Sequence, residues 1–198
     1  MLHDKQFLGA LSVVIGLCGY VPYLRGLYRR KFRPHVFTWF LWGLLMFIAF
    51  AAQIAGGGGA GTWVTGISAA MCTFVAVVAC FHGEKNITRS DWITFIAGLM
   101  TVPLWLITDT PLWSMILIIL IELLATWPTA RKSWMKPQQE SPLAYLMAGI
   151  KFIPSALAMR DFNFITLSYP VALVAMNAAL ILLIMGRRYA LERRFNWD

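Results

Sequence analysis

Long apolar stretches run through this chain and limit what it can fold into. A helix needs roughly 20 mostly apolar residues to cross the hydrocarbon core of a bilayer, and stretches of about that length recur along the sequence. Short segments with glycine, proline or charged residues separate them. The predicted membrane spans are Phe7–Tyr28, Val36–Ala55, Gly61–His82, Trp92–Thr108, Leu112–Arg131, Pro142–Arg160 and Phe162–Met185. The sequence therefore predicts an all-α integral membrane protein with seven transmembrane helices.

The composition excludes an ordinary soluble domain. Of the 198 residues, 59% are hydrophobic and 13% are charged, whereas a soluble domain carries roughly 25% charged residues. The apolar run from Met115 to Ile121 does not alternate with polar residues, as the strands of a membrane β-barrel would. Cys18, Cys72 and Cys80 all lie in apolar segments without metal-ligand spacing, so we interpret them as small hydrophobic residues.

Basic residues mark one side of the predicted membrane protein. Alternate loops and the C-terminal tail hold 14 of the 17 Lys and Arg residues. These residues are Arg25, Arg29, Arg30, Lys31, Arg33, Lys85, Arg89, Arg131, Lys132, Lys136, Arg187, Arg188, Arg193 and Arg194. Loops rich in Lys and Arg stay in the cytoplasm. We therefore expect a plasma (inner) membrane protein with its N-terminus outside and its C-terminus in the cytoplasm, and no nucleic-acid partner.

The two ends of the chain match each other when the sequence is shifted by 106 residues. The matching pairs include Pro22 and Pro128, Arg25 and Arg131, Gly43 and Gly149, and Trp63 and Tyr169. Both matching parts would begin outside and end inside, so they would be parallel repeats, a pattern found in transporters. We expect a first three-helix repeat at 1–83, a linker helix at 84–110, and a second repeat with a basic tail at 111–198.

This 3+1+3 plan, with a proline in the first and fifth helices, resembles the SWEET and PQ-loop (MtN3-like) transporter superfamily. The resemblance covers nearly the whole chain. It departs from the family's Pro-Gln dipeptide, because tyrosine follows Pro22 and threonine follows Pro128. The family uses prolines of helices one, two, five and six as hinges, so the resemblance implies hinge roles for Pro22, Pro128 and Pro154. Ile48 occupies the remaining position of that set.

The same resemblance implies a ligand contact on the last helix. SWEET proteins hold a sugar between asparagines of helices three and seven, and Asn177 looks like the second of these. Met71 stands at the position of the first, which argues against a sugar. An amide in lipid also needs a helix–helix hydrogen bond, so a packing role for Asn177 stays open.

Glu122 and Lys151 are the most informative charges in the sequence. Each lies about nine or ten residues into its span, counted from opposite faces of the membrane. The rise along a helix therefore places both residues at a similar depth in the membrane. One charge at the membrane centre costs at least ~2.5–3.5 kcal/mol. We therefore expect the two residues to meet as an ion pair or hydrogen-bonded pair. The pair would serve either as a substrate or proton-coupling site or as a buried bridge that only fixes packing.

Aromatic and hydroxyl residues supply further candidates. Trp63 and Tyr169 coincide in the repeat near the outer ends of helices three and seven, where they would form an extracellular gate or part of an interfacial aromatic belt. Thr65, Ser68 and Thr73 on helix three would face the same cavity or bond their own helix.

These features predict a transporter or facilitator that moves a small polar solute, such as a sugar, vitamin or organic acid, by alternating access. The alternative is a seven-helix receptor or scaffold that binds a ligand without transport. No catalytic arrangement, metal site or cofactor is predicted, so we expect no enzyme activity. The expected partners are the solute and the lipid bilayer, and the chain would act as a monomer or a homo-oligomer.

Overall fold

The computed structural model describes residues 2–30, 34–83, 89–100, 102–103, 107, 111–135, 137–140 and 142–195, and this part of the chain is helical without strands. Its α-helices are α1 (Leu2–Tyr28), α2 (Val36–Ala55), α3 (Trp63–His82), α4 (Arg89–Leu99), α6 (Pro111–Met135), α7 (Pro142–Ile150), α8 (Phe152–Ala158) and α9 (Phe164–Phe195). Two short 3₁₀ helices are η1 (Gly59–Thr62) and η2 (Pro137–Gln139).

Four helical stretches in the described residues are long and apolar enough to cross a membrane. They are His3–Tyr28, Val36–Ala55, Gly59–His82 and Phe164–Glu192, and a shorter apolar stretch covers Pro142–Ala158. Large hydrophobic side chains such as Phe47, Phe81 and Leu182 are exposed on them. Surface of this kind is covered by lipid in a membrane protein, so the all-α membrane class predicted from composition agrees with the structure.

The helices follow the apolar stretches closely, with differences in the second half. The second span begins and ends where it was predicted, at Val36 and Ala55. The fourth predicted span, Trp92–Thr108, is helical in α4 as far as Leu99, and most of its remainder lies outside the described residues. The last helix continues past Met185 to Phe195, because polar residues with good helix propensity follow the apolar stretch.

The sixth predicted span is divided into two helices. α7 ends at Ile150, α8 begins at Phe152, and Lys151 lies between them in a turn. Pro154 explains the break, because its nitrogen carries no hydrogen and cannot bond the carbonyl of Ile150. The single helix expected over Pro142–Arg160 is therefore corrected to two, with the division at a charged residue.

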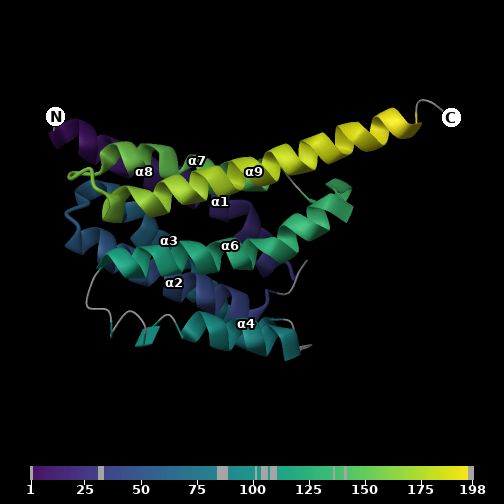
Figure 1. Ribbon diagram of the computed structural model, residues 1–198, viewed down its shortest axis with the longest axis horizontal. Helices are drawn as coiled ribbons and strands as arrows, with labels where there is room; N and C mark the ends of the chain where they lie inside the picture. Colours follow the sequence, from purple (N-terminus) through teal and green to yellow (C-terminus); the bar gives the residue numbers. More distant parts are fainter. Residues whose placement is uncertain are drawn as a thin grey trace.

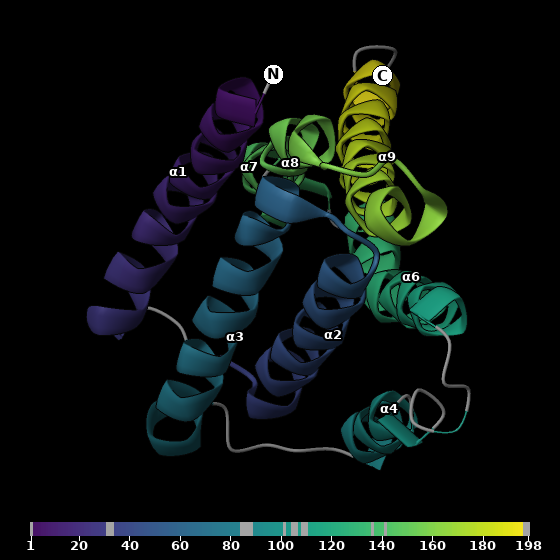
Figure 2. The ribbon, with the colours of Figure 1, turned by 90° about the vertical axis from the view of Figure 1, so that its left-hand side faces the viewer.

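The long helices run side by side, and α9 extends beyond the other helices at its C-terminal end (Figure 1). Seen along the bundle, α1, α3 and α2 form one side, and α8 lies beside α1 and α3 (Figure 2). α9 and α6 lie beside α2, and α4 lies at the edge, also beside α2 (Figure 2). Phe37 and Phe95 stack at 4.2 Å between ring centroids where α4 meets α2.

The hydrophobic core lies where α2, α3, α6, α8 and α9 converge. Its buried members are Leu45, Ile48, Ala49, Ala52, Val64, Met115, Ile118, Phe152, Tyr169 and Leu173. Because these helices come from both halves of the chain, the core joins the two halves. Glu122 and Lys151 lie beside this core.

Candidate functional site

Lys151 is buried at the break between α7 and α8, with 6% of its surface exposed. Its ammonium nitrogen donates a hydrogen bond of 2.9 Å to Ser68 Oγ on α3. The same nitrogen lies 5.2 Å from the ring centroid of Tyr20 and 5.0 Å from that of Phe152, distances at which aromatic faces attract a cation. Gly16 on α1 leaves room for the lysine stem, since a Cβ there would lie 3.4 Å from Lys151 Cδ.

Glu122 is buried on α6, with 5% of its surface exposed. Its Oε1 accepts a hydrogen bond of 3.1 Å from the hydroxyl of Tyr169 on α9. Tyr169 is itself fully buried and meets Phe152 edge to face, at 6.4 Å between ring centroids. Tyr169 therefore holds the carboxylate of Glu122 and also contacts Phe152, the residue that follows Lys151.

Cys72 on α3 lies beside Tyr20. Its sulfur is 3.6 Å from the hydroxyl of Tyr20, the residue whose ring faces the ammonium of Lys151. We call the set Tyr20, Ser68, Cys72, Glu122, Lys151 and Tyr169 the central cluster. It draws one or two side chains from each of α1, α3, α6, α9 and the α7–α8 break.

The direct pairing predicted between Glu122 and Lys151 is corrected by these contacts. Among the described residues the carboxylate bonds Tyr169 and the ammonium bonds Ser68. The reason is the order of the helices in space. α6 and α8 both pack on α9, and Tyr169 of α9 contacts Glu122 of α6 and Phe152 of α8.

Of the other predicted binding residues, Tyr169 lies in the central cluster, whereas Asn177 and Trp63 do not. Asn177 Nδ2 donates to the carbonyl of Leu173 on its own helix at 2.8 Å, and its side chain packs where Gly149 lacks a Cβ. Trp63 begins α3 with 42% of its surface exposed, whereas Tyr169 is fully buried. The proposed Trp63–Tyr169 gate is therefore not formed, because one ring faces outward and the other belongs to the core.

The candidate hinge prolines occupy different settings. Pro154 is buried next to the helix break, whereas Pro22 lies exposed inside the continuous helix α1. Pro128 falls within α6, and its side chain is outside the described residues. Only Pro154 thus coincides with an interrupted helix in the described part of the chain.

Sequence reasoning missed Tyr20 and treated Cys72 as hydrophobic filler. A signal for Cys72 was present, since Thr65, Ser68 and Cys72 are spaced to share one face of a helix. Thr65 is fully buried, and its hydroxyl has no hydrogen-bond partner among the residues that the structure describes. This face of α3 therefore carries polar groups inward, toward Lys151.

Searches against protein-family models, curated proteins and solved structures returned no match. The function is therefore argued from the central cluster and the helix arrangement.

Proposed function

We propose that this protein is a membrane transporter or facilitator that moves a small polar solute by alternating access between two three-helix bundles. The central cluster would be its solute site. The observation that carries the proposal is the pair of buried opposite charges, Glu122 and Lys151, each held by a neutral partner.

Burying two charges that do not neutralise each other in direct contact costs free energy. A bridge kept only for packing gains most when carboxylate and ammonium touch. Here each group keeps capacity for a further partner, since an ammonium has more N–H donors than the one that Ser68 receives, and a carboxylate has a second oxygen. Charged groups inside membrane proteins typically line substrate or ion pathways, and these two fit that use.

The interrupted helix supports the same function. Transporters often build their sites from discontinuous helices near the middle of the membrane, at the interface between repeats. Lys151 lies at the α7–α8 break and contacts Ser68 and Tyr20 of the first half of the chain.

Helix packing supports the proposed 3+1+3 plan. α3 packs on α1 and α2, and α9 packs in the same way on α6, α7 and α8. Between the halves, α1 packs on α8 and α2 packs on α6, so first and second helices exchange partners reciprocally. α4 packs on α2, as a linker at the edge would. We propose in addition that the chain crosses the membrane seven times and that its plan resembles that of the SWEET and PQ-loop superfamily.

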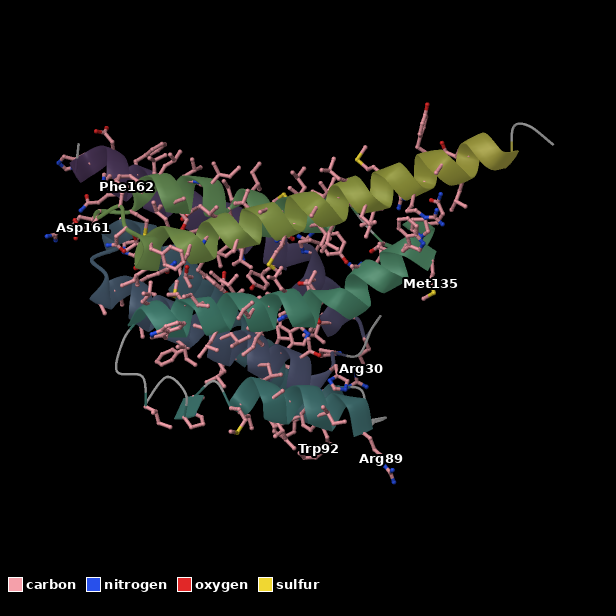
Figure 3. The ribbon with its side chains drawn as sticks, in the orientation of Figure 1. Arg30, Arg89, Trp92, Met135, Asp161 and Phe162 are labelled. Atoms are coloured by element: carbon pink, nitrogen blue, oxygen red, sulfur yellow. The ribbon has the colours of Figure 1, made fainter. Side chains whose placement is uncertain are left out.

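The charge distribution supports the proposed orientation. Arg30 and Arg89 lie at one end of the molecule, and Asp161 and Phe162 lie at the other (Figure 3). On this proposal the end with Arg30 and Arg89 faces the cytoplasm, with the N-terminus outside and the basic end of the last helix inside.

The test begins with a thermal-stability screen of the detergent-solubilised protein against sugars, vitamins, amino acids and organic acids, because a ligand stabilises the fold by mass action. Any stabilising compound is then offered to proteoliposomes. We expect accumulation, and its loss in the Glu122→Gln and Lys151→Met variants, whereas Glu192→Gln, a change of an exposed carboxylate on α9, keeps it.

Undiminished uptake in both site variants would leave Glu122 and Lys151 with a packing role only. A compound that stabilises the protein without being accumulated would indicate a receptor on the same fold.

A further inference from the structure

We propose that an anionic phospholipid binds where the basic end of α9 lies against the end of α6 and the turn at η2. Its phosphate would bind the guanidinium groups of Arg187 and Arg188, beside the ring of Trp134. We call this place the α6–α9 corner. The inference goes beyond the proposed function, because it needs a membrane but no transported solute.

The depth of the α6–α9 corner in a membrane follows from the length of α9. The apolar part of this helix runs from Phe164 to Met185 and is followed by Gly186. At about 1.5 Å of rise per residue this part is about 33 Å long, which is close to the roughly 30 Å of the hydrocarbon core. Arg187 and Arg188 therefore lie at the level of the lipid phosphates, whichever side of the membrane they face.

Arg187 is held against an aromatic ring. Its guanidinium carbon lies 4.2 Å from the ring centroid of Trp134, a distance at which the ring attracts a cation. Its Nε donates a hydrogen bond of 3.2 Å to the carbonyl of the same tryptophan. A guanidinium has five N–H donors, and among the described residues only the one on Nε is used. The two terminal nitrogens are left to bind the oxygens of a phosphate.

Arg188 is held by the turn that follows α6. Its Nε donates to Pro137 O at 3.1 Å, and its Nη2 donates to Glu140 O at 2.6 Å. These acceptors are backbone carbonyls, as is the acceptor of Arg187, and a carbonyl does not cancel the charge of its donor. Two positive charges are thus fixed in position before a ligand arrives, which lowers the cost of ordering them on binding. Guanidinium groups match the geometry of phosphate oxygens.

The sequence around the α6–α9 corner is strongly basic. Segments 131–140 and 187–198 together hold seven Lys or Arg residues and three Asp or Glu residues. The basic residues are Arg131, Lys132, Lys136, Arg187, Arg188, Arg193 and Arg194. Basic segments at a membrane surface attract anionic lipids. A zwitterionic lipid carries its own ammonium group and gains less from this excess of positive charge.

Exposed apolar side chains beside the arginines suit the acyl chains of a lipid. Trp134 and Met135 are 53% and 58% exposed, and Leu182 and Met185, within two turns before Arg187, are 73% and 57% exposed. α9 extends beyond the other helices (Figure 1), and Met135 lies at the end of α6 beneath this extension (Figure 3). A soluble phosphate would use the arginines alone. A phospholipid uses both the arginines and the apolar surface, so the observations favour a lipid.

The experiment measures lipid binding to the full chain in detergent by native mass spectrometry. The probe is phosphatidylglycerol, and phosphatidylcholine with the same acyl chains is the zwitterionic comparison. We expect phosphatidylglycerol to stay bound and to raise the melting temperature by mass action, and phosphatidylcholine to do neither at the same concentration. Arg187→Gln with Arg188→Gln should weaken binding of phosphatidylglycerol about 25-fold, since each basic residue near the membrane surface contributes about fivefold.

Arg25→Gln with Arg29→Gln is the matched control. It removes the same two charges from exposed arginines at the end of α1, and it should leave binding of phosphatidylglycerol close to that of the unmodified protein. An equal loss in the two double variants would assign the binding to net charge and overturn the α6–α9 corner.

Two other results also overturn the proposal. One is equal binding of phosphatidylcholine. The other is displacement of phosphatidylglycerol by inorganic phosphate with an equal rise in melting temperature, which would indicate a site for a soluble anion. Should the double variant at the corner not fold, Arg187→Gln alone provides a second test, because the hydrogen bond that it removes is exposed. It should bind phosphatidylglycerol about fivefold more weakly, and unchanged binding counts against the corner.

Discussion

At the scale of single residues, the central cluster shows how a buried charge is held without a counter-charge in contact. Lys151 depends on Ser68 and on the faces of Tyr20 and Phe152. Glu122 depends on Tyr169. Ser68, Tyr20 and Tyr169 each come from a different helix than the charge they serve, whereas Phe152 directly follows Lys151 in the chain. Loss of one partner therefore leaves a desolvated charge rather than a hydrated one.

Ser68→Ala removes the hydrogen-bond acceptor of Lys151. We expect a loss of about 1–3 kcal/mol of stability, because a buried charged donor is left with one partner fewer. Thr73→Ala on the same helix is the control. Its hydroxyl bonds the carbonyl of Ala69 on its own helix, and its removal should stay within about 0.5 kcal/mol. Thermal unfolding in detergent measures both, and equal melting temperatures would contradict the role given to Ser68.

At the scale of elements, the α7–α8 break is a difference between the second half of the chain and the first. α2 continues without interruption through Ile48, the position that corresponds to Pro154 in the 106-residue shift. Both halves thus have a second helix of similar extent, but only the second half is divided at a charge. This local difference follows from one proline.

Pro154→Ala restores the missing N–H and should allow α7 and α8 to form one continuous helix. We expect unchanged or higher thermal stability together with slower uptake, since a straight helix resists the bending that alternating access between the two bundles requires. Pro170→Ala is the control, because Pro170 lies inside the continuous helix α9. Its uptake should match the unmodified protein. Equal uptake by both variants would assign Pro154 to a static kink.

At the scale of the whole molecule, close contact between the halves depends on glycine. A Cβ at Gly61 would lie 2.6 Å from Ser155 O and 2.7 Å from the backbone nitrogen of Met159. Side chains are excluded there by the backbone of α8, which no rotamer change can move aside. The fit between η1 and α8 therefore requires a residue without a side chain.

Gly61→Ala should destabilise the protein by about 1–3 kcal/mol, since the halves must move apart to admit a methyl group. Gly186→Ala, in α9 with nothing within 4 Å of the added carbon, should instead stabilise it by up to about 1 kcal/mol through helix propensity. Melting temperatures in detergent distinguish the two. A Gly61→Ala protein as stable as the unmodified one would show that the halves are not in tight contact.

The sequence alone determined the approximate extent of the long apolar helices and the burial of Glu122 and Lys151. The ends of α2 at Val36 and Ala55 and the burial of Glu122 and Lys151 follow from it, because the length of an apolar run and the hydrogen-bonding of the backbone are local properties. Only the tertiary structure decided which groups meet. Glu122 bonds Tyr169, Lys151 bonds Ser68, and Asn177 bonds its own helix. Such pairings depend on the order and rotation of helices around the core, and chain neighbours such as α6 and α7 need not be neighbours in space.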